Sequence, residues 1–289
     1  MEVTTGAMRK LLSENRNDSP PLEGQEISQQ EYQPRIPTPR WLKGLMVAVI
    51  AVLFGFALLI WWNSHKTTHA TLTQGLIGYW SFDSNSVSKN HVKDISGNGN
   101  DGSMTSRPDL VTGKIGQALQ FNDRNRYVDL GSQALINNLH ALSFSAWVYP
   151  IAGSGEERII DKGGINSSGW LVNLNNSAKN WHFIAYFTGG SVERSNDYNT
   201  TEHDMWQHIV VTWDGSATGT NVKMYVNGEE TAYRSTFDGS GSRNDDATYH
   251  LYLGDASSLI PYNGLIDEVR IYNRVLSADE VKELYNMAR

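Results

Sequence analysis

From Gly75 onward the chain consists of short apolar runs separated by clusters of turn-forming residues. In LSFSAWVY (142–149) every second residue is apolar on one side, which is the period of a strand with one buried face. Asn227-Gly228 lies between two such runs and predicts a two-residue hairpin. Many short strands with almost no helical period favour an all-β fold, a two-sheet antiparallel jelly-roll sandwich over residues 75–289.

One short helix is predicted at the C-terminus. Ser277 and Glu280 have the spacing of a capping box, in which each side chain bonds a backbone N–H at the helix start. Val281, Leu284 and Tyr285 then form one apolar side. The helix is expected against the edge of the sandwich.

The stretch from Gly44 to Trp62, GLMVAVIAVLFGFALLIWW, holds no charged residue. Its length matches a bilayer core of roughly 30 Å, so we predict a transmembrane helix at 44–62. Basic residues lie mostly before this stretch, which predicts a signal-anchor with the N-terminus cytoplasmic and the large C-terminal part outside the membrane. The localisation expected is therefore the cell membrane, with a single span.

Two further segments complete the predicted organisation. Residues 1–43 are rich in Pro, Gln, Glu and Ser, which predicts a disordered cytoplasmic tail. Residues 63–74, NSHKTTHATLTQ, are expected to form a polar linker. The chain has no cysteine and a net charge of −7, and its acidic C-terminal part speaks against a nucleic-acid partner.

Taken in order, several segments resemble a known family. These are LIGYWSFD, DISGNGNDG, GKIGQALQF, YVDLG, SFSAWVYP, WQHIVVTWDG, VKMYVNGE and GLIDEVRIYNRVLSADEVKELY. They are similar to a LamG-like domain, the laminin G-type branch of the concanavalin A-like lectin/glucanase superfamily. The resemblance covers roughly residues 76–286. It implies a two-sheet sandwich with a non-catalytic role in adhesion or glycan recognition.

The segment DISGNGNDG (94–102) allows several interpretations. Its glycines match a nucleotide fingerprint, but no helix period follows, and an EF-hand would need a Glu where Thr105 stands. Asp94, Asn98 and Asn100 offer oxygen ligands for a structural calcium ion. The resemblance implies that Asp267 would complete such a site. Turn chemistry alone, with Asp267 paired to a nearby arginine, explains the same residues equally well.

No catalytic constellation is predicted. The carboxylates occur in adjacent pairs such as Glu156-Glu157 and Asp267-Glu268, and adjacent residues of a strand point to opposite faces. His208 is expected to serve packing. The sequence therefore predicts a protein that is not an enzyme.

The predicted function is recognition or adhesion at the cell surface, with a glycan or an extracellular protein as the partner. Sugar sites use aromatic platforms, and the candidates are Trp170, Trp181, Tyr186 and Tyr198. Core packing is the competing interpretation for each ring. An alternative function is transmembrane signalling as an anti-sigma-type receptor, in which the sandwich would be the sensor. A glycoside-active enzyme is the third, less favoured class.

Overall fold

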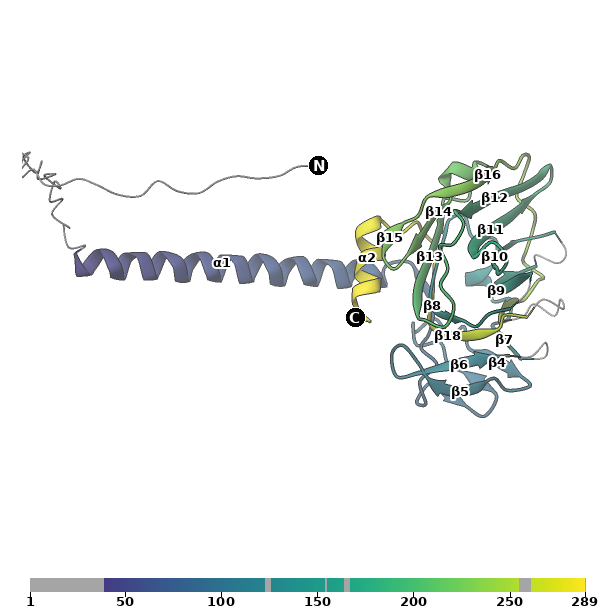
Figure 1. Cartoon of the computed structure of the whole chain (residues 1–289), viewed down its shortest axis with the longest axis horizontal. Helices are drawn as coiled ribbons and strands as arrows, with labels where there is room; N and C mark the ends of the chain where they lie inside the picture. The colour runs from purple at the N-terminus through teal and green to yellow at the C-terminus, as the bar shows by residue number, and fades with distance from the viewer. Residues whose placement is uncertain (1–38, 123–125, 154, 164–166, 255–260, 289) are drawn as a thin grey trace, which may run out of the picture. The chain divides into compact units, whose positions relative to one another are not determined.

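Figure 1 shows the computed structural model of the chain, which describes residues 39–122, 126–153, 155–163, 167–254 and 261–288. The chain divides into two units, Met1–Phe56 and Ala57–Arg289. Most of the predicted tail, residues 1–38, lies outside the described residues.

A single helix, α1 (Arg40–Thr73), replaces both the predicted apolar helix and the predicted linker. Residues 63–73 of the predicted polar linker are helical, because the helical hydrogen bonding continues through this Thr-rich segment despite its low helix propensity. The predicted transmembrane helix at 44–62 is not supported: among the described residues, no helix is both long and apolar enough to cross a membrane.

The second unit contains the predicted two antiparallel sheets. Sheet A has the strand order β15-β14-β13-β8-β18-β6-β5, and β1 also pairs with β18. Its strands are β1 (Leu76–Trp80), β5 (Asp109–Thr112), β6 (Gln117–Phe121), β8 (Leu142–Pro150), β13 (Gln207–Trp213), β14 (Lys223–Val226), β15 (Glu229–Glu230) and β18 (Gly264–Tyr272).

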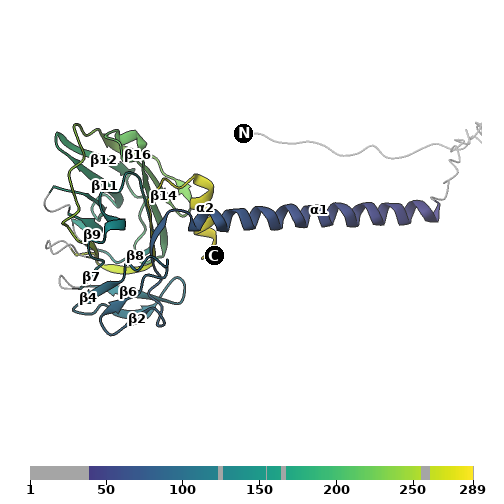
Figure 2. The same ribbon diagram turned by 180° about the vertical axis from the view of Figure 1, so that it is seen from behind.

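Sheet B has the order β16-β12-β11-β10-β9-β17-β7-β4-β3-β2, and Figure 2 shows part of this succession from behind. Its strands are β2 (Val87–Ser88), β3 (His91–Val92), β4 (Gly102–Thr105), β7 (Tyr127–Asp129), β9 (Glu156–Lys162), β10 (Trp170–Asn175), β11 (Asn180–Phe187), β12 (Gly190–Asn196), β16 (Tyr233–Phe237) and β17 (Leu251–Leu253). In the part of the chain that the structure describes, 3-10 turns at Ala134–Ile136 and Gly219–Asn221 lie in the connections.

The space between the sheets is filled by one large apolar cluster. Its bulkiest members are four fully buried indoles, Trp80, Trp170, Trp181 and Trp213. Phe183 and Trp213 bring the two sheets together, with ring centroids 5.6 Å apart. The predicted alternation of buried and outward-facing residues is therefore confirmed, since every second residue of the central strands lies in this core.

Helix α2 (Ala278–Asn286) begins with the predicted capping box, in which the Ser277 and Glu280 side chains bond each other's backbone N–H. It contacts the edge strand β15, as expected, but it also lies on the outer face of sheet A. There Tyr285 stacks on Trp147 with centroids 5.6 Å apart. We call this outer side of sheet A the covered face.

Apolar side chains of α2 and of the residues that it packs against form a second core. Its members are Leu72, Val210, Tyr225, Tyr272, Leu276, Val281 and Leu284. Sheet A therefore packs its inner face against sheet B, while α2 covers part of its outer face.

The hairpin predicted at Asn227-Gly228 is confirmed. Val226 of β14 pairs with Glu229 of β15, so two residues form the turn. Asn227 and Gly228 have φ values of +53° and +84°, the left-handed backbone that such turns require.

Candidate functional site

The outer side of sheet B carries polar side chains in register, and we call it the polar face. Partners in antiparallel strands project to the same side of a sheet, so the pairing defines rows across the face. The first row is Phe237, Glu193, Ile184, Leu171, Asp161, Tyr252, Asp129 and Ser103, from β16 to β4. The second row is Ser235, Ser195, His182, Asn173 and Arg158.

One end of the polar face is hollowed. A cavity of about 260 Å³ opens over strands β9 to β12 and β16. It is lined by Glu156, Asn175, Asn180, His182, Glu193, Ser195, Arg234, Ser235 and Phe237. Phe237 is 57 % exposed, so an apolar ring stands beside carboxylates, amides and hydroxyls.

Contacts within the cavity fix its polar groups. His182 Nε2 lies 3.3 Å from Glu193 Oε2, and Ser191 Oγ donates to Glu193 Oε1 over 2.6 Å. The amide of Asn175 donates to Glu156 at 3.5 Å, which is a weak contact. Glu193 is therefore held rigidly, while Glu156, which is exposed, keeps oxygens to accept hydrogen bonds from a ligand.

Two of the four predicted platform residues lie elsewhere. Trp170 and Trp181 are 1 % and 2 % exposed and belong to the core between the sheets. Their prediction as sugar platforms is wrong, because a ring must present a face to solvent to stack on a sugar. Both alternate with the residues of the polar face, so they point the opposite way.

The two predicted tyrosines lie near the cavity. Tyr186 is half-buried on β11, and burial raises the pKa of its hydroxyl, with Arg158, Glu193 and Glu156 as the charges nearby. Tyr198 is 51 % exposed, and the guanidinium carbon of Arg234 lies 4.3 Å from its ring centroid. Since Arg234 lines the cavity, Tyr198 stands at the rim.

In the DISGNGNDG loop, Asp94 is buried and fixes the backbone. Its Oδ1 accepts from the N–H of Tyr79 at 3.0 Å and of Ser96 at 2.8 Å, and its Oδ2 accepts from the N–H of Asn100 at 3.0 Å. Gly97 and Gly99 have positive φ, as turn chemistry requires. The carboxylate thus organises the loop through backbone hydrogen bonds.

The other predicted calcium ligands also make protein contacts. Asn98 donates to Leu76 O at 2.8 Å and Asn100 to Ile77 O at 2.5 Å, so both amides tie the loop to β1. Asp267 Oδ2 accepts from the N–H groups of Lys114 and Ile115 at 2.9 and 3.0 Å. The described residues contain no cluster of three acidic or histidine side chains placed to hold a metal. Calcium binding stays a prediction.

The strand around Asp267 departs from regular alternation. A bulge between Asp267 and Arg270 places Glu268 at φ +55°, and both carboxylates are buried. The alternative that Asp267 pairs with Arg270 or Arg274 is not borne out, because Arg270 pairs with Glu268 at 2.6 Å and Arg274 pairs with Glu280 at 2.7 Å. Burial raises the pKa of Asp267 to about 7.

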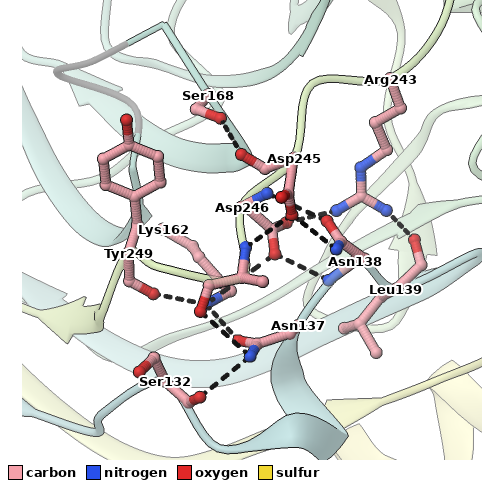
Figure 3. Close-up of polar contacts among 11 residues, drawn as sticks. Ser132, Asn137, Asn138, Leu139, Lys162, Ser168, Arg243, Asp245, Asp246 and Tyr249 are labelled. Carbon is pink, nitrogen blue, oxygen red and sulfur yellow. Dashed lines mark hydrogen bonds and ion pairs between the residues drawn. The ribbon is translucent and has the colours of Figure 1, made fainter.

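Lys162 is a second buried group whose pKa is shifted toward neutral pH. Burial lowers the pKa of Lys162 to about 8, and such lysines serve as nucleophiles in some enzymes. Its Nζ, however, donates to Asn137 Oδ1 at 2.8 Å and to Tyr249 O at 2.6 Å (Figure 3). The side chain is 0 % exposed. The amine is therefore enclosed by the protein.

The surrounding network joins loops that are distant in sequence. Asp246 accepts from the Asn138 N–H at 2.7 Å and from Arg243 Nη2 at 2.5 Å, while Asn138 Oδ1 accepts from the Asp246 N–H at 3.0 Å (Figure 3). Lys162 thereby connects β9 to the loop that contains Asn137 and to the loop that contains Tyr249. We assign this network a structural role behind the polar face.

Sequence reasoning missed His182, Glu193 and Phe237. Alternation in WHFIAYF (181–187) could have identified His182, since it lies opposite the large apolar residues of that strand. Glu193 and Phe237 come from later strands, and only the register of β12 and β16 brings them to the cavity.

The fold and the sequence together define the class of the protein. The Laminin_G_3 profile, described as concanavalin A-like lectin/glucanases superfamily, matches residues 122–282. The chain belongs to this superfamily, which confirms the resemblance read from its motifs.

Relatives show what similar chains look like. The non-toxic nonhemagglutinin of Paraclostridium bifermentans is 24 % identical over 209 residues, which are 68 % of this chain and 16 % of that protein. The binding domain of Paraclostridial Mosquitocidal Protein 1 has a TM-score of 0.59 at 18 % identity and covers 75 % of this chain and 53 % of its own. The chain therefore spans only 16 % and 53 % of the length of these two relatives.

Two solved complexes share the fold and contain sugars. One is the binding domain of botulinum neurotoxin DC in complex with SialylT, with a TM-score of 0.55 at 15 % identity, covering 75 % of this chain and 52 % of its own. The other is domain 4 of AbnA, an extracellular GH43 arabinanase from Geobacillus stearothermophilus, in complex with arabinotriose. It has a TM-score of 0.50 at 22 % identity and covers 73 % of this chain and 98 % of its own.

Proposed function

We propose that the sandwich is a carbohydrate-binding module whose site is the cavity on the polar face. The observation that carries this proposal is the lining itself. Carboxylate, amide and hydroxyl groups suit sugar hydroxyls, and the exposed ring of Phe237 suits the apolar side of a sugar. Sugar complexes among proteins of this fold support the proposal.

The proposed action is binding without chemistry. Glu193 is already bonded by Ser191 and lies beside His182, which suits a fixed acceptor better than a group that shuttles protons. Glu157, adjacent to Glu156, is buried away from the cavity, where its carboxylate accepts from the Asn263 N–H at 3.0 Å.

A glycan array with the full chain in detergent tests the proposal. Binding to at least one glycan is expected, and Phe237→Ala or Glu193→Gln should weaken it about tenfold, the change typical of a lost binding contact. Val275→Ala, at an exposed apolar residue before α2, is the matched control and should bind normally. Binding to no glycan would overturn the proposal and favour a protein partner.

We further propose that the stretch 44–62 holds the chain at a membrane, with the sandwich outside the cytoplasm. The absence of charge in this stretch supports the proposal, as does the exposure of every large apolar side chain from Leu45 to Ile60. The chain should remain in the membrane fraction after a carbonate wash, and Leu53→Arg should release part of it. Recovery of the unaltered chain in the wash would contradict the anchor.

A further inference from the structure

A second group of aromatic side chains lies on the polar face, away from the cavity. Tyr127 and Tyr252 meet edge to face with centroids 5.5 Å apart, and the His250 ring lies 6.0 Å from Tyr252 at 30°. His250 Nδ1 is 2.9 Å from both oxygens of Asp129. We call these four residues the tyrosine patch.

The patch is partly open to solvent and internally fixed. The His250 side chain is 45 % exposed, and both tyrosines are half-buried. Asp129 Oδ1 also accepts from the Gly131 N–H at 2.8 Å, which holds the carboxylate beside the rings. Rings beside a fixed carboxylate offer an apolar surface together with a hydrogen-bond acceptor, the same combination as in the cavity.

The sheet register connects the patch to the cavity. Tyr252 and Asp129 belong to the row that begins with Phe237 and Glu193 at the cavity. Five strand spacings separate Glu193 in β12 from Asp129 in β7, which is about 24 Å at the usual spacing of strands. The two sites therefore share one face of one sheet and lie within reach of one extended ligand.

Between the two sites the row consists of Ile184, Leu171 and Asp161, of which the last two are 1 % and 2 % exposed. Arg158 and Asp161 form an ion pair on this stretch of the face, so their charges compensate each other. Asp129 contacts His250, and Glu193 contacts His182, so each of these carboxylates already has a polar partner. Carboxylates that are engaged in this way suit a hydroxyl-rich ligand without charge of its own.

We propose that the tyrosine patch is a second subsite for the far end of an uncharged oligosaccharide whose near end occupies the cavity. This inference rests on the proposed function and extends it from a single sugar to a chain that crosses the strands. The patch contributes to affinity only when the oligosaccharide is long enough to reach it. Affinity therefore rises with chain length.

The test uses arabino-, xylo-, cello- and galacto-oligosaccharides, each from the monosaccharide to the hexasaccharide, with the full chain in detergent. In the series that binds, affinity should increase with length. Tyr252→Ala should lower the affinity for the longest members about tenfold and leave that for the monosaccharide unchanged. Tyr252→Phe keeps the ring and should retain most of the affinity. Thermal melting confirms that each variant is folded.

The outcomes separate the two proposals. Affinity that does not depend on length, or long members that bind Tyr252→Ala as well as they bind the unaltered chain, would overturn the second subsite while the cavity stands. Loss of monosaccharide and hexasaccharide affinity alike in a folded Tyr252→Ala chain would also overturn it. Preference for sialylated over neutral glycans on the array would contradict the uncharged ligand. The absence of any sugar binding would overturn both proposals.

Discussion

The outer faces of the two sheets differ in how far they are buried. On the covered face of sheet A, Trp147 and His208 are buried beneath Tyr285 of α2. On the polar face of sheet B, Glu193 and Tyr252 are only partly buried and no α-helix among the described residues overlies them. The difference teaches that the two outer faces have different surroundings: α2 packs on part of the covered face, where its contacts contribute to stability, and the cavity opens on the polar face.

The largest effect that we expect from this comparison is a loss of stability in acid. Burial, with Arg270 nearby, lowers the pKa of His208 to about 3 from its usual 6.5. Below pH 6.5 the His208 side chain takes up a proton in the unfolded chain but stays neutral in the folded chain. The free energy of unfolding therefore falls as the pH falls. Between pH 6.5 and 3 this one residue should lower the free energy of unfolding by about 4 kcal/mol.

His208→Gln should therefore flatten the decline of stability in acid, as measured by denaturant unfolding across this pH range. Ser145→Ala removes the 2.9 Å contact with His208 Nε2 but keeps the imidazole, so it should retain the decline. Phe237→Ala on the polar face should change the free energy of unfolding by no more than about 0.5 kcal/mol at neutral pH. An equal acid response in His208→Gln and the unaltered chain would break the comparison.

A smaller effect is expected from calcium at the DISGNGNDG loop, which borders β1 of sheet A. If the ion binds, calcium at a hundred times its dissociation constant raises the free energy of unfolding by about 2.7 kcal/mol. Melting the chain in calcium and in EGTA measures this difference, and Asp94→Asn should abolish it. Identical melting curves in the two buffers would show that the protein contacts of Asp94 suffice to fix the loop.

Local patterns predicted much of the fold. Period-2 alternation predicted the strands of the sandwich, and Asn227-Gly228 and the Ser277–Glu280 pair predicted a turn and a helix start that the structure contains. Each of these signals lies within a few neighbouring residues. The helix through 63–73 was missed because propensity is a weak signal that the surrounding structure can override.

The candidate site was less predictable. Trp170 and Trp181 were plausible platforms because a strand pattern does not tell which of its two faces lies inside when both carry apolar residues. Glu193 and Phe237 lie far apart in sequence and become neighbours only through strand pairing. Tyr198 was found by its residue type, and its place at the rim depends on Arg234, which no local pattern connects to it.

The register of β10 to β12 interleaves two kinds of position along the same strands, so that Phe183 enters the core while its neighbour His182 lines the cavity. The side chains that line the cavity can consequently be substituted at alternate positions, with little disturbance to the packing beneath. The same arrangement makes the strands intolerant of a change in length. Inserting a single residue into β11 would exchange the two sets, placing the polar side chains in the core and the large rings in solvent.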